Sequence, residues 1–152
     1  MRKSKIVGAV FVAIIIIIQL IPSGRPDTIK DNKNDLLLNN LVSDSVSQIF
    51  RNACYNCHSN ETKYPWYSYV APVSWLISSD VRKGRKHLNF SEWESYSKID
   101  KAKHLDDISD EISDNEMPLT IYKIMHRDAR LSSEERDVLV RWTDDFSDSL
   151  FE

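Results

Sequence analysis

The feature that most constrains the fold is a nearly unbroken apolar run from Ile6 to Ile21, which includes five consecutive isoleucines. A membrane-spanning helix needs roughly 17 to 25 apolar residues and the core of a signal peptide roughly 7 to 15, so the run falls between them. The following "QLIPSGRPD" lacks the small-residue pattern ending in Ala that signal peptidase prefers. We therefore interpret residues 1–23 as an uncleaved signal anchor, with a cleaved signal peptide as the alternative. A buried soluble helix fits less well because the run has no polar face.

Basic residues give this anchor a direction. Arg2, Lys3 and Lys5 precede the run, and the positive-inside rule keeps such a terminus in the cytoplasm. The sequence thus predicts a single-pass protein of the bacterial inner membrane, with its C-terminal part in the periplasm.

The rest of the chain has the size and charge of one small acidic domain. Of 152 residues 41% are hydrophobic, which is enough for a single modest core. The first 23 residues hold three basic and no acidic residues, so the remainder has 17 basic against 23 acidic residues. Such a domain is a poor binder of nucleic acid.

Turn-forming residues separate the anchor from the domain. The segment from Pro22 to Leu41 is rich in Pro, Asp and Asn, which favour turns. We interpret residues 24–43 as a linker and residues 44–152 as the domain. The stretch "LLLNNLV" leaves open the alternative of an ordered strap across the domain.

Helical signals dominate residues 44–152. The chain has only 3 glycines and no alternating apolar and polar run bounded by hairpin turns, so an all-α fold is predicted. Four helices are expected from apolar spacing and start signals. They comprise one from Asp44 into Cys54, one from Pro72, one from Glu92 to Ser113 behind a Ser91–Glu94 capping box, and one behind a Ser132–Glu135 capping box with the stripe Val138, Leu139, Trp142 and Phe146.

Both cysteines of the chain lie in the stretch Cys54-Tyr55-Asn56-Cys57-His58. A c-type haem is held by thioether bonds from two cysteines to the porphyrin vinyl groups, and two intervening residues let both sulfurs face one edge of the macrocycle. A histidine directly after the second cysteine can place its imidazole over the iron. The motif therefore predicts one covalent haem c, with His58 as the proximal axial ligand.

Two other uses of the cysteines are weaker. In an oxidising compartment the pair could form a redox-active or structural disulfide. A thioredoxin-like site, however, would need a preceding strand. Zinc would need two further ligands at a fixed interval, and the four histidines of the chain are too scattered to supply them.

Met117 is the candidate for the second axial position. It precedes Pro118, which biases it away from helical geometry, so its thioether could lie against the open face of the haem. The rivals are Met125 and His126, and a core methionine is the ordinary alternative. His87 and His104 are expected to face solvent.

Aromatic residues follow the motif at once. Tyr64, Trp66 and Trp75 could bury a flat apolar porphyrin and keep water from the iron, although simple core packing would produce the same residues. The basic residues Arg82, Lys83, Arg85 and Lys86 could pair with haem propionates, but a solvated helix face is the preferred interpretation.

The order of these segments resembles a known family. An N-terminal apolar run, "CYNCHSNETKYPWYSYVAPVSW", "GRKHLNFSEW" and "EMPLTIYKIMHRDARLSSEER" are similar to the haem-binding domain family of small bacterial cell-envelope proteins. The resemblance covers roughly Val46 to Phe146. It implies covalent haem through Cys54 and Cys57 with His58 as proximal ligand, in a small cytochrome c-like helical domain. The Met-Pro pair is also similar to that of class I cytochromes c, which supports Met117.

Two functions are expected from these features. The first is single-electron transfer by a membrane-tethered carrier with His/Met ligation, acting with an unidentified redox protein; such a carrier is not an enzyme. The alternative is an enzyme or sensor with a five-coordinate haem that binds a small ligand such as peroxide or nitric oxide, with His126 or Arg127 in a distal pocket.

Overall fold

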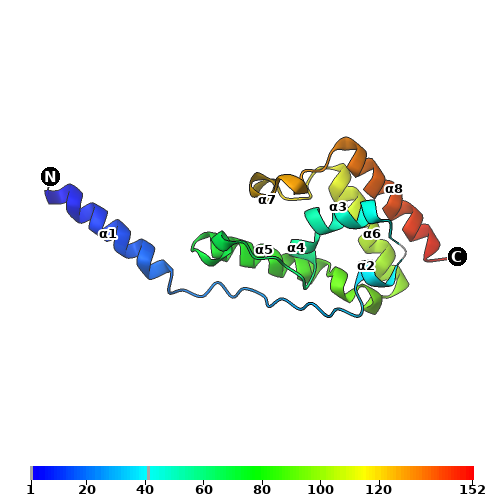
Figure 1. Cartoon of the computed structure of the whole chain (residues 1–152), viewed down its shortest axis with the longest axis horizontal. Coiled ribbons are helices and arrows are strands. Elements are labelled where there is room, and N and C mark those ends of the chain that lie inside the picture. Colours follow the sequence, from blue (N-terminus) through cyan, green and yellow to red (C-terminus); the bar gives the residue numbers. More distant parts are fainter. Residues whose placement is uncertain (1, 41) are drawn as a thin grey trace.

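The computed structural model describes residues 2–40 and 42–152, and within these residues the regular elements are all helices, as predicted (Figure 1). The α-helices are α1 (Arg2–Ile18), α2 (Leu36–Asn39), α3 (Asp44–Ala53), α4 (Tyr55–His58), α5 (Val73–His87), α6 (Lys98–Ser113), α7 (Thr120–Met125) and α8 (Ser133–Ser149). Three short 3₁₀ helices join them, η1 (Trp66–Tyr69), η2 (Phe90–Ser95) and η3 (Arg127–Ala129).

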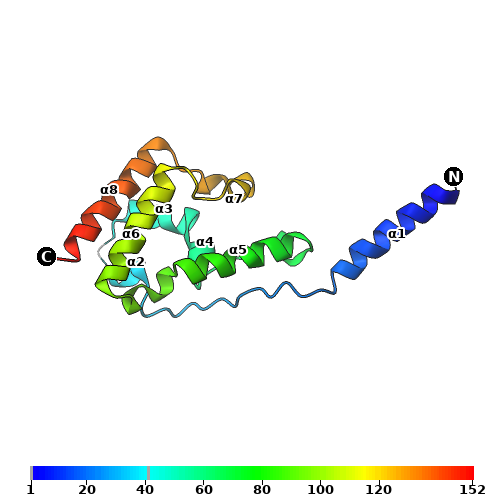
Figure 2. The ribbon, with the colours of Figure 1, turned by 180° about the vertical axis from the view of Figure 1, so that it is seen from behind.

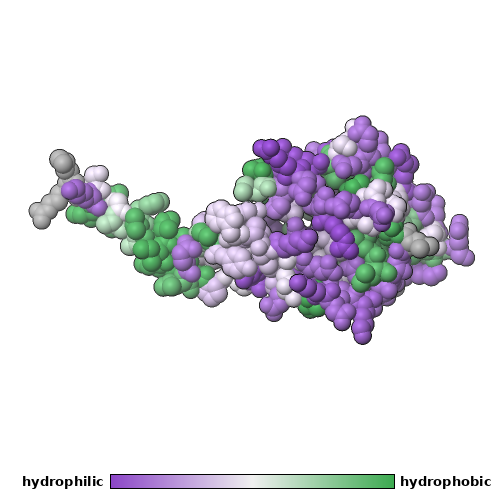
Figure 3. Space-filling model, viewed as in Figure 1, coloured by the Kyte–Doolittle hydropathy of each residue, from purple (hydrophilic) through white to green (hydrophobic). Residues whose placement is uncertain are grey.

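Helix α1 projects away from the other helices (Figures 1 and 2), and its apolar side chains are exposed. Figure 3 shows it as a mostly hydrophobic rod beside a polar body. Among the described residues, no helix combines the length and the apolar character needed to cross a membrane. At about 1.5 Å per residue, α1 is roughly 25 Å long and begins with polar residues, against a hydrocarbon core of about 30 Å. The predicted single-pass inner-membrane topology is therefore wrong, and the structure does not support the predicted anchor helix.

The helix ends before the apolar run does because Gln19 makes tertiary contacts. Its side-chain amide donates to the Ala71 carbonyl at 3.2 Å, and its carbonyl oxygen accepts from the Ala71 N–H at 2.9 Å. The indole N–H of Trp75 then donates to the Ile21 carbonyl at 3.2 Å. From this point the chain runs extended along the side of α5 (Figures 1 and 2).

The extended segment of residues 19–35, here called the strap, is hydrogen-bonded to the helical body. Arg82 donates to the Ser23 carbonyl at 3.0 Å, Tyr64 donates to the Pro26 carbonyl at 2.9 Å, and the Ile29 N–H donates to the Asn60 carbonyl at 2.8 Å. These bonds hold Ser23, Pro26 and Ile29 against the helical body.

The strap ends in the core. Asp35 caps α2 by accepting from the Leu37 N–H at 2.9 Å, and Leu36 is completely buried. The core around it is built from α2, α3, α4, η2, α6 and α8. Its buried apolar members include Phe50, Tyr55, Phe90, Trp93, Leu105, Ile112 and Leu139.

Helices α6 and α8 lie side by side (Figures 1 and 2) and form the most extensive helix pair of the fold. The predicted capping box of α8 is confirmed, because Ser132 accepts from the Glu135 N–H and Glu135 accepts from the Ser132 N–H. Leu139 on its predicted stripe is completely buried.

The predicted helix from Glu92 to Ser113 is wrong at its start. Residues Phe90–Ser95 form η2, and α6 begins only at Lys98, capped by Ser97. Ser91 does not cap a helix, because its hydroxyl accepts from the Asn60 N–H at 3.0 Å and donates to Asp35 at 3.4 Å. The Ser91 hydroxyl thus makes long-range hydrogen bonds instead of the local capping bond that the sequence predicts.

Candidate functional site

Cys54 immediately precedes the short helix α4, and Cys57 lies within that helix. Helix α3 ends at Ala53, as its apolar spacing predicted, and Cys54 is both its C-cap and the residue before α4. The N–H groups of Cys57 and His58 both donate to the Cys54 carbonyl, at 3.1 and 2.9 Å. One turn of helix therefore sets the spacing of all three motif side chains.

Helix α5 holds α4 in place through a glycine. A Cβ atom on Gly84 would lie 2.7 Å from the Cys57 carbonyl oxygen and 3.1 Å from its carbonyl carbon. Because real Cβ atoms do not come so close to backbone, only glycine permits this approach. Gly84 thus fixes the distance between α5 and the motif.

The His58 ring is oriented by a backbone carbonyl. Its Nδ1 lies 3.2 Å from the Leu88 carbonyl oxygen. Since a carbonyl only accepts, Nδ1 carries the proton and Nε2 keeps its lone pair. Burial lowers the pKa of His58, which also favours the neutral ring. A neutral imidazole with a free Nε2, held by a carbonyl on the other nitrogen, is the usual state of a metal-binding histidine.

The two cysteines are free and half-buried. Burial raises the pKa of Cys54 to about 12, with a smaller contribution from Cys57. Burial likewise raises the pKa of Cys57 to about 11, with a smaller contribution from Asp80. Both thiols are therefore protonated at neutral pH, whereas a nucleophilic or zinc-binding cysteine is a thiolate.

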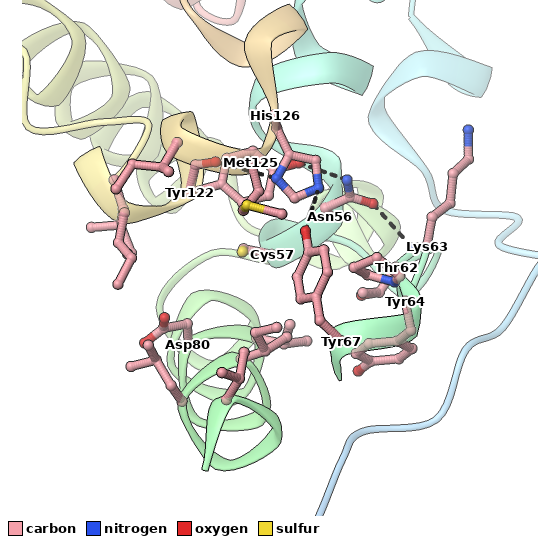
Figure 4. A pocket seen from close by; sticks show the side chains of 18 of the residues that line it. Asn56, Cys57, Thr62, Lys63, Tyr64, Tyr67, Asp80, Tyr122, Met125 and His126 are labelled. Carbon is pink, nitrogen blue, oxygen red and sulfur yellow. Dashed lines mark hydrogen bonds between the residues drawn. The ribbon is translucent and has the colours of Figure 1, made fainter. Parts of the chain in front are cut away.

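Two mostly apolar cavities border the motif. The smaller, about 90 Å³, is lined by Cys54, His58 and Met117, together with Phe90 and Leu131. The larger, about 360 Å³, lies between α5 and α7 and is reached by Cys57 (Figure 4). Cys54 and His58 thus border the smaller cavity, and Cys57 borders the larger one.

Met117 lies in the turn between α6 and α7. Its N–H donates to the Glu111 carbonyl at 3.1 Å, and its side chain is half-buried while Pro118 is buried. The structure therefore brings Met117 to the same cavity as His58 and Cys54, although the residues are far apart in sequence.

The rivals for the second axial position border the other cavity. His126 is engaged at both ring nitrogens, with Nδ1 3.2 Å from the Tyr122 carbonyl and Nε2 3.3 Å from the Tyr67 hydroxyl (Figure 4). Its ring stacks on Tyr122 at a centroid distance of 4.0 Å. Met125 also borders the larger cavity but is 61% exposed.

Of the predicted aromatic pocket residues, Tyr64 and Trp66 line the larger cavity and Trp75 does not. Trp75 instead holds the strap through its indole N–H. Sequence reasoning missed Tyr122, whose hydroxyl accepts from the Asn56 side chain at 2.7 Å and so links α7 to the motif (Figure 4). In the sequence, only the position of Tyr122 between Met117 and His126 indicates a place at the site.

The remaining two histidines differ from each other. His87 is exposed, as expected, and lies 3.9 Å from Asp107. His104 is half-buried rather than solvent-facing, with its ring 4.9 Å from that of Tyr96 and its buried Nδ1 unpartnered among the described residues. Both border the smaller cavity.

These residues fit a haem. The two cavities are lined mainly by apolar side chains, as a porphyrin requires, and each borders part of the cysteine motif. The neutral His58 ring and the thioether of Met117 are ligands of the kind that haem iron accepts. A helical fold with this site defines a class of small haem-binding domains.

Comparison with known protein families places the chain within that class. A family model described as "Haem-binding domain" matches residues 13–145, and the chain belongs to this family. No curated protein and no solved structure matches the chain.

Proposed function

We propose that the protein carries one covalent haem c and transfers single electrons. The observation that carries this proposal is that Cys54, His58 and Met117, from segments far apart in the chain, border one apolar cavity. Bound haem would supply an iron that takes up and releases one electron. The protein itself would supply the attachment, the ligands and the exclusion of water.

Each residue has a role in this proposal. Cys54 and Cys57 would hold the group through thioether bonds, and their protonated state suits addition to a vinyl group. His58 would be the proximal ligand, oriented by the Leu88 carbonyl. Met117 would be the distal ligand, and a Met/His pair raises the reduction potential and leaves no open coordination position. Tyr64 and Trp66 would shield the edge near Cys57.

Covalent attachment is tested by extraction. The wild-type protein, produced with the apparatus that attaches haem c, is treated with acidified acetone, and the pyridine haemochrome of the protein fraction is recorded. We expect a haemochrome with two thioethers in the wild type and a shifted band from one thioether in Cys54→Ser or Cys57→Ser. Complete loss of haem to the solvent from the wild type would reject covalent attachment.

The distal ligand is tested by a matched pair of variants. Met117→Ala should abolish the methionine-to-iron charge-transfer band near the red end of the ferric spectrum and lower the reduction potential. His126→Ala should leave both unchanged, because His126 is bound to Tyr67 and Tyr122 in the other cavity. If Met117→Ala leaves the band and the potential intact, the assignment is wrong.

A second candidate function is favoured by the larger cavity. A space of about 360 Å³ that holds the polar His126–Tyr67 pair could admit a small ligand beside a five-coordinate haem. Arg127, the other expected distal residue, is exposed and does not border this cavity. Rapid binding of carbon monoxide to the ferrous protein would support the enzyme or sensor, whereas an unreactive six-coordinate spectrum would support electron transfer.

A further inference from the structure

The C-terminal end of α6 has an unusual backbone conformation at Asn115. Among the described residues, Asn115 is the one residue other than glycine with a positive φ, which is 60°. In this left-handed conformation the Cβ atom of an L-residue comes too close to the following carbonyl oxygen, and asparagine is one of the few residues that tolerate it. Asn115 therefore accepts a backbone turn that most other residues would resist.

The hydrogen bonds at the end of α6 depend on this turn. The Asn115 N–H donates to the Ile112 carbonyl at 3.1 Å, and the Glu116 N–H donates to the Glu111 carbonyl at 3.0 Å. Together with a left-handed residue, these two bonds form a Schellman motif, which closes the C-terminus of a helix. The Met117 N–H donates to the same Glu111 carbonyl at 3.1 Å. The backbone of Met117 is thus held against the last turn of α6.

This last turn is fixed relative to the smaller cavity. Ile112 is 3% exposed and belongs to the hydrophobic core, and Pro118, which follows Met117, is buried. Ile112, Met117 and Pro118 all border the smaller cavity, as does His58. The backbone turn at Asn115 therefore decides where the Met117 thioether lies along the wall of this cavity.

The side chain of Asn115 is exposed, so packing explains little of its role. What Asn115 contributes is the conformation that its backbone accepts. Glycine adopts a positive φ without steric cost, whereas for a β-branched residue such a φ is a true outlier. Glycine should therefore replace Asn115 without loss, and valine should not.

We propose that Asn115 is a positioning residue for Met117. By accepting the left-handed turn at the end of α6, it brings the Met117 thioether to the cavity that His58 borders. Its effect on the iron rests on the His58 and Met117 ligation of the proposed function. The placement of Met117 itself can be measured without haem.

The first test is NMR spectroscopy of the full chain, produced without attached haem and labelled with [methyl-¹³C]methionine. The chain has only 3 methionines, so the Met117 signal can be assigned by its loss in Met117→Leu. We expect Asn115→Val to shift the Met117 signal and Asn115→Gly to leave it at the wild-type position. Tryptophan fluorescence checks that each variant folds, and Asn115→Ala replaces Asn115→Val in the same comparison if the valine variant does not.

The matched control is Asp114→Val. Asp114 precedes Asn115 and is also exposed, but it has an ordinary right-handed conformation with a φ of −79°. The same new side chain at this position should leave the Met117 signal unchanged. A Met117 signal that stays in place in Asn115→Val, or that moves as far in Asn115→Gly or Asp114→Val, would overturn the proposal.

The second test uses the haem-loaded protein. Asn115→Val should weaken the methionine-to-iron charge-transfer band of the ferric spectrum and lower the reduction potential, because the thioether is displaced from the iron. Asn115→Gly should keep both at the wild-type values. A band and a potential that are unchanged in Asn115→Val would overturn the role of Asn115 in ligation.

The outcome is separable from that of the proposed ligand. If the loaded wild type has no such band, Met117 is not the distal ligand, and the NMR comparison still decides whether Asn115 places Met117. If the band is present but neither the band nor the methyl signal responds to Asn115→Val, the ligand proposal stands and the Asn115 proposal fails.

Discussion

Gly84→Ala is the substitution for which the structure gives the sharpest expectation. The new methyl group would lie 2.7 Å from the Cys57 carbonyl oxygen and 3.3 Å from the Cys57 Cβ. Because the nearest atoms are backbone, the clash cannot be relieved by a side-chain rotation, and α5 must move away from α4. Such overpacking costs about 1–3 kcal/mol. Alanine returns up to about 1 kcal/mol through its better helix propensity. We expect a net loss of about 1–2 kcal/mol in the free energy of unfolding.

The assay is urea denaturation followed by tryptophan fluorescence. With a slope of about 2 kcal/mol per molar, the expected loss lowers the midpoint by roughly 0.5–1 M. Gly8→Ala in α1 is the matched control, because no atom lies within 4 Å of its added Cβ, and its midpoint should not fall. If Gly84→Ala were as stable as the wild type, the close approach of α5 to the motif would be refuted.

Three further substitutions probe other parts of the fold. Leu139→Ala empties a completely buried position and should cost about 2–5 kcal/mol in the same assay, whereas a loss below 1 kcal/mol would contradict the α6–α8 packing. Ser132→Ala removes the α8 cap and should cost about 1 kcal/mol, with Ser133→Ala as a control that should cost much less. Burial raises the pKa of Asp35 above 3.8, so the folded state holds the proton more tightly, and stability should fall as pH rises from about 4 through the raised pKa. Asp35→Asn should remove that pH dependence. Urea midpoints measured between pH 4 and 7 test this, and the reasoning fails if the midpoint of the variant changes with pH as steeply as that of the wild type.

Elements whose sequence pattern is local could be predicted. The stripe of α8 and its Ser132–Glu135 capping box need only neighbouring residues, and both are as expected. The same holds for α3, whose apolar face leads directly into Cys54.

Elements decided by distant partners could not be predicted. Ser91 has the spacing of a cap, but its bonds to Asn60 and Asp35 come from other segments. The apolar run continues past Ile18, yet α1 stops there as Gln19 bonds to Ala71. In each case tertiary hydrogen bonds outweighed a local propensity that is worth only a fraction of a kcal/mol per residue.

The two residues inside the cysteine motif show why its surroundings matter as much as its spacing. Tyr55 points into the core, where its ring stacks on Phe90 at 5.3 Å and its hydroxyl donates to Asp35 at 2.9 Å. Asn56 points the other way and donates to the Tyr122 hydroxyl at 2.7 Å. Tyr55 therefore connects α4 to the strap and the core, and Asn56 connects it to α7. Since successive residues of a helical turn point in different directions, these two side chains fix the rotation of α4 about its axis. That rotation brings Cys57 to the larger cavity and Cys54 to the smaller one.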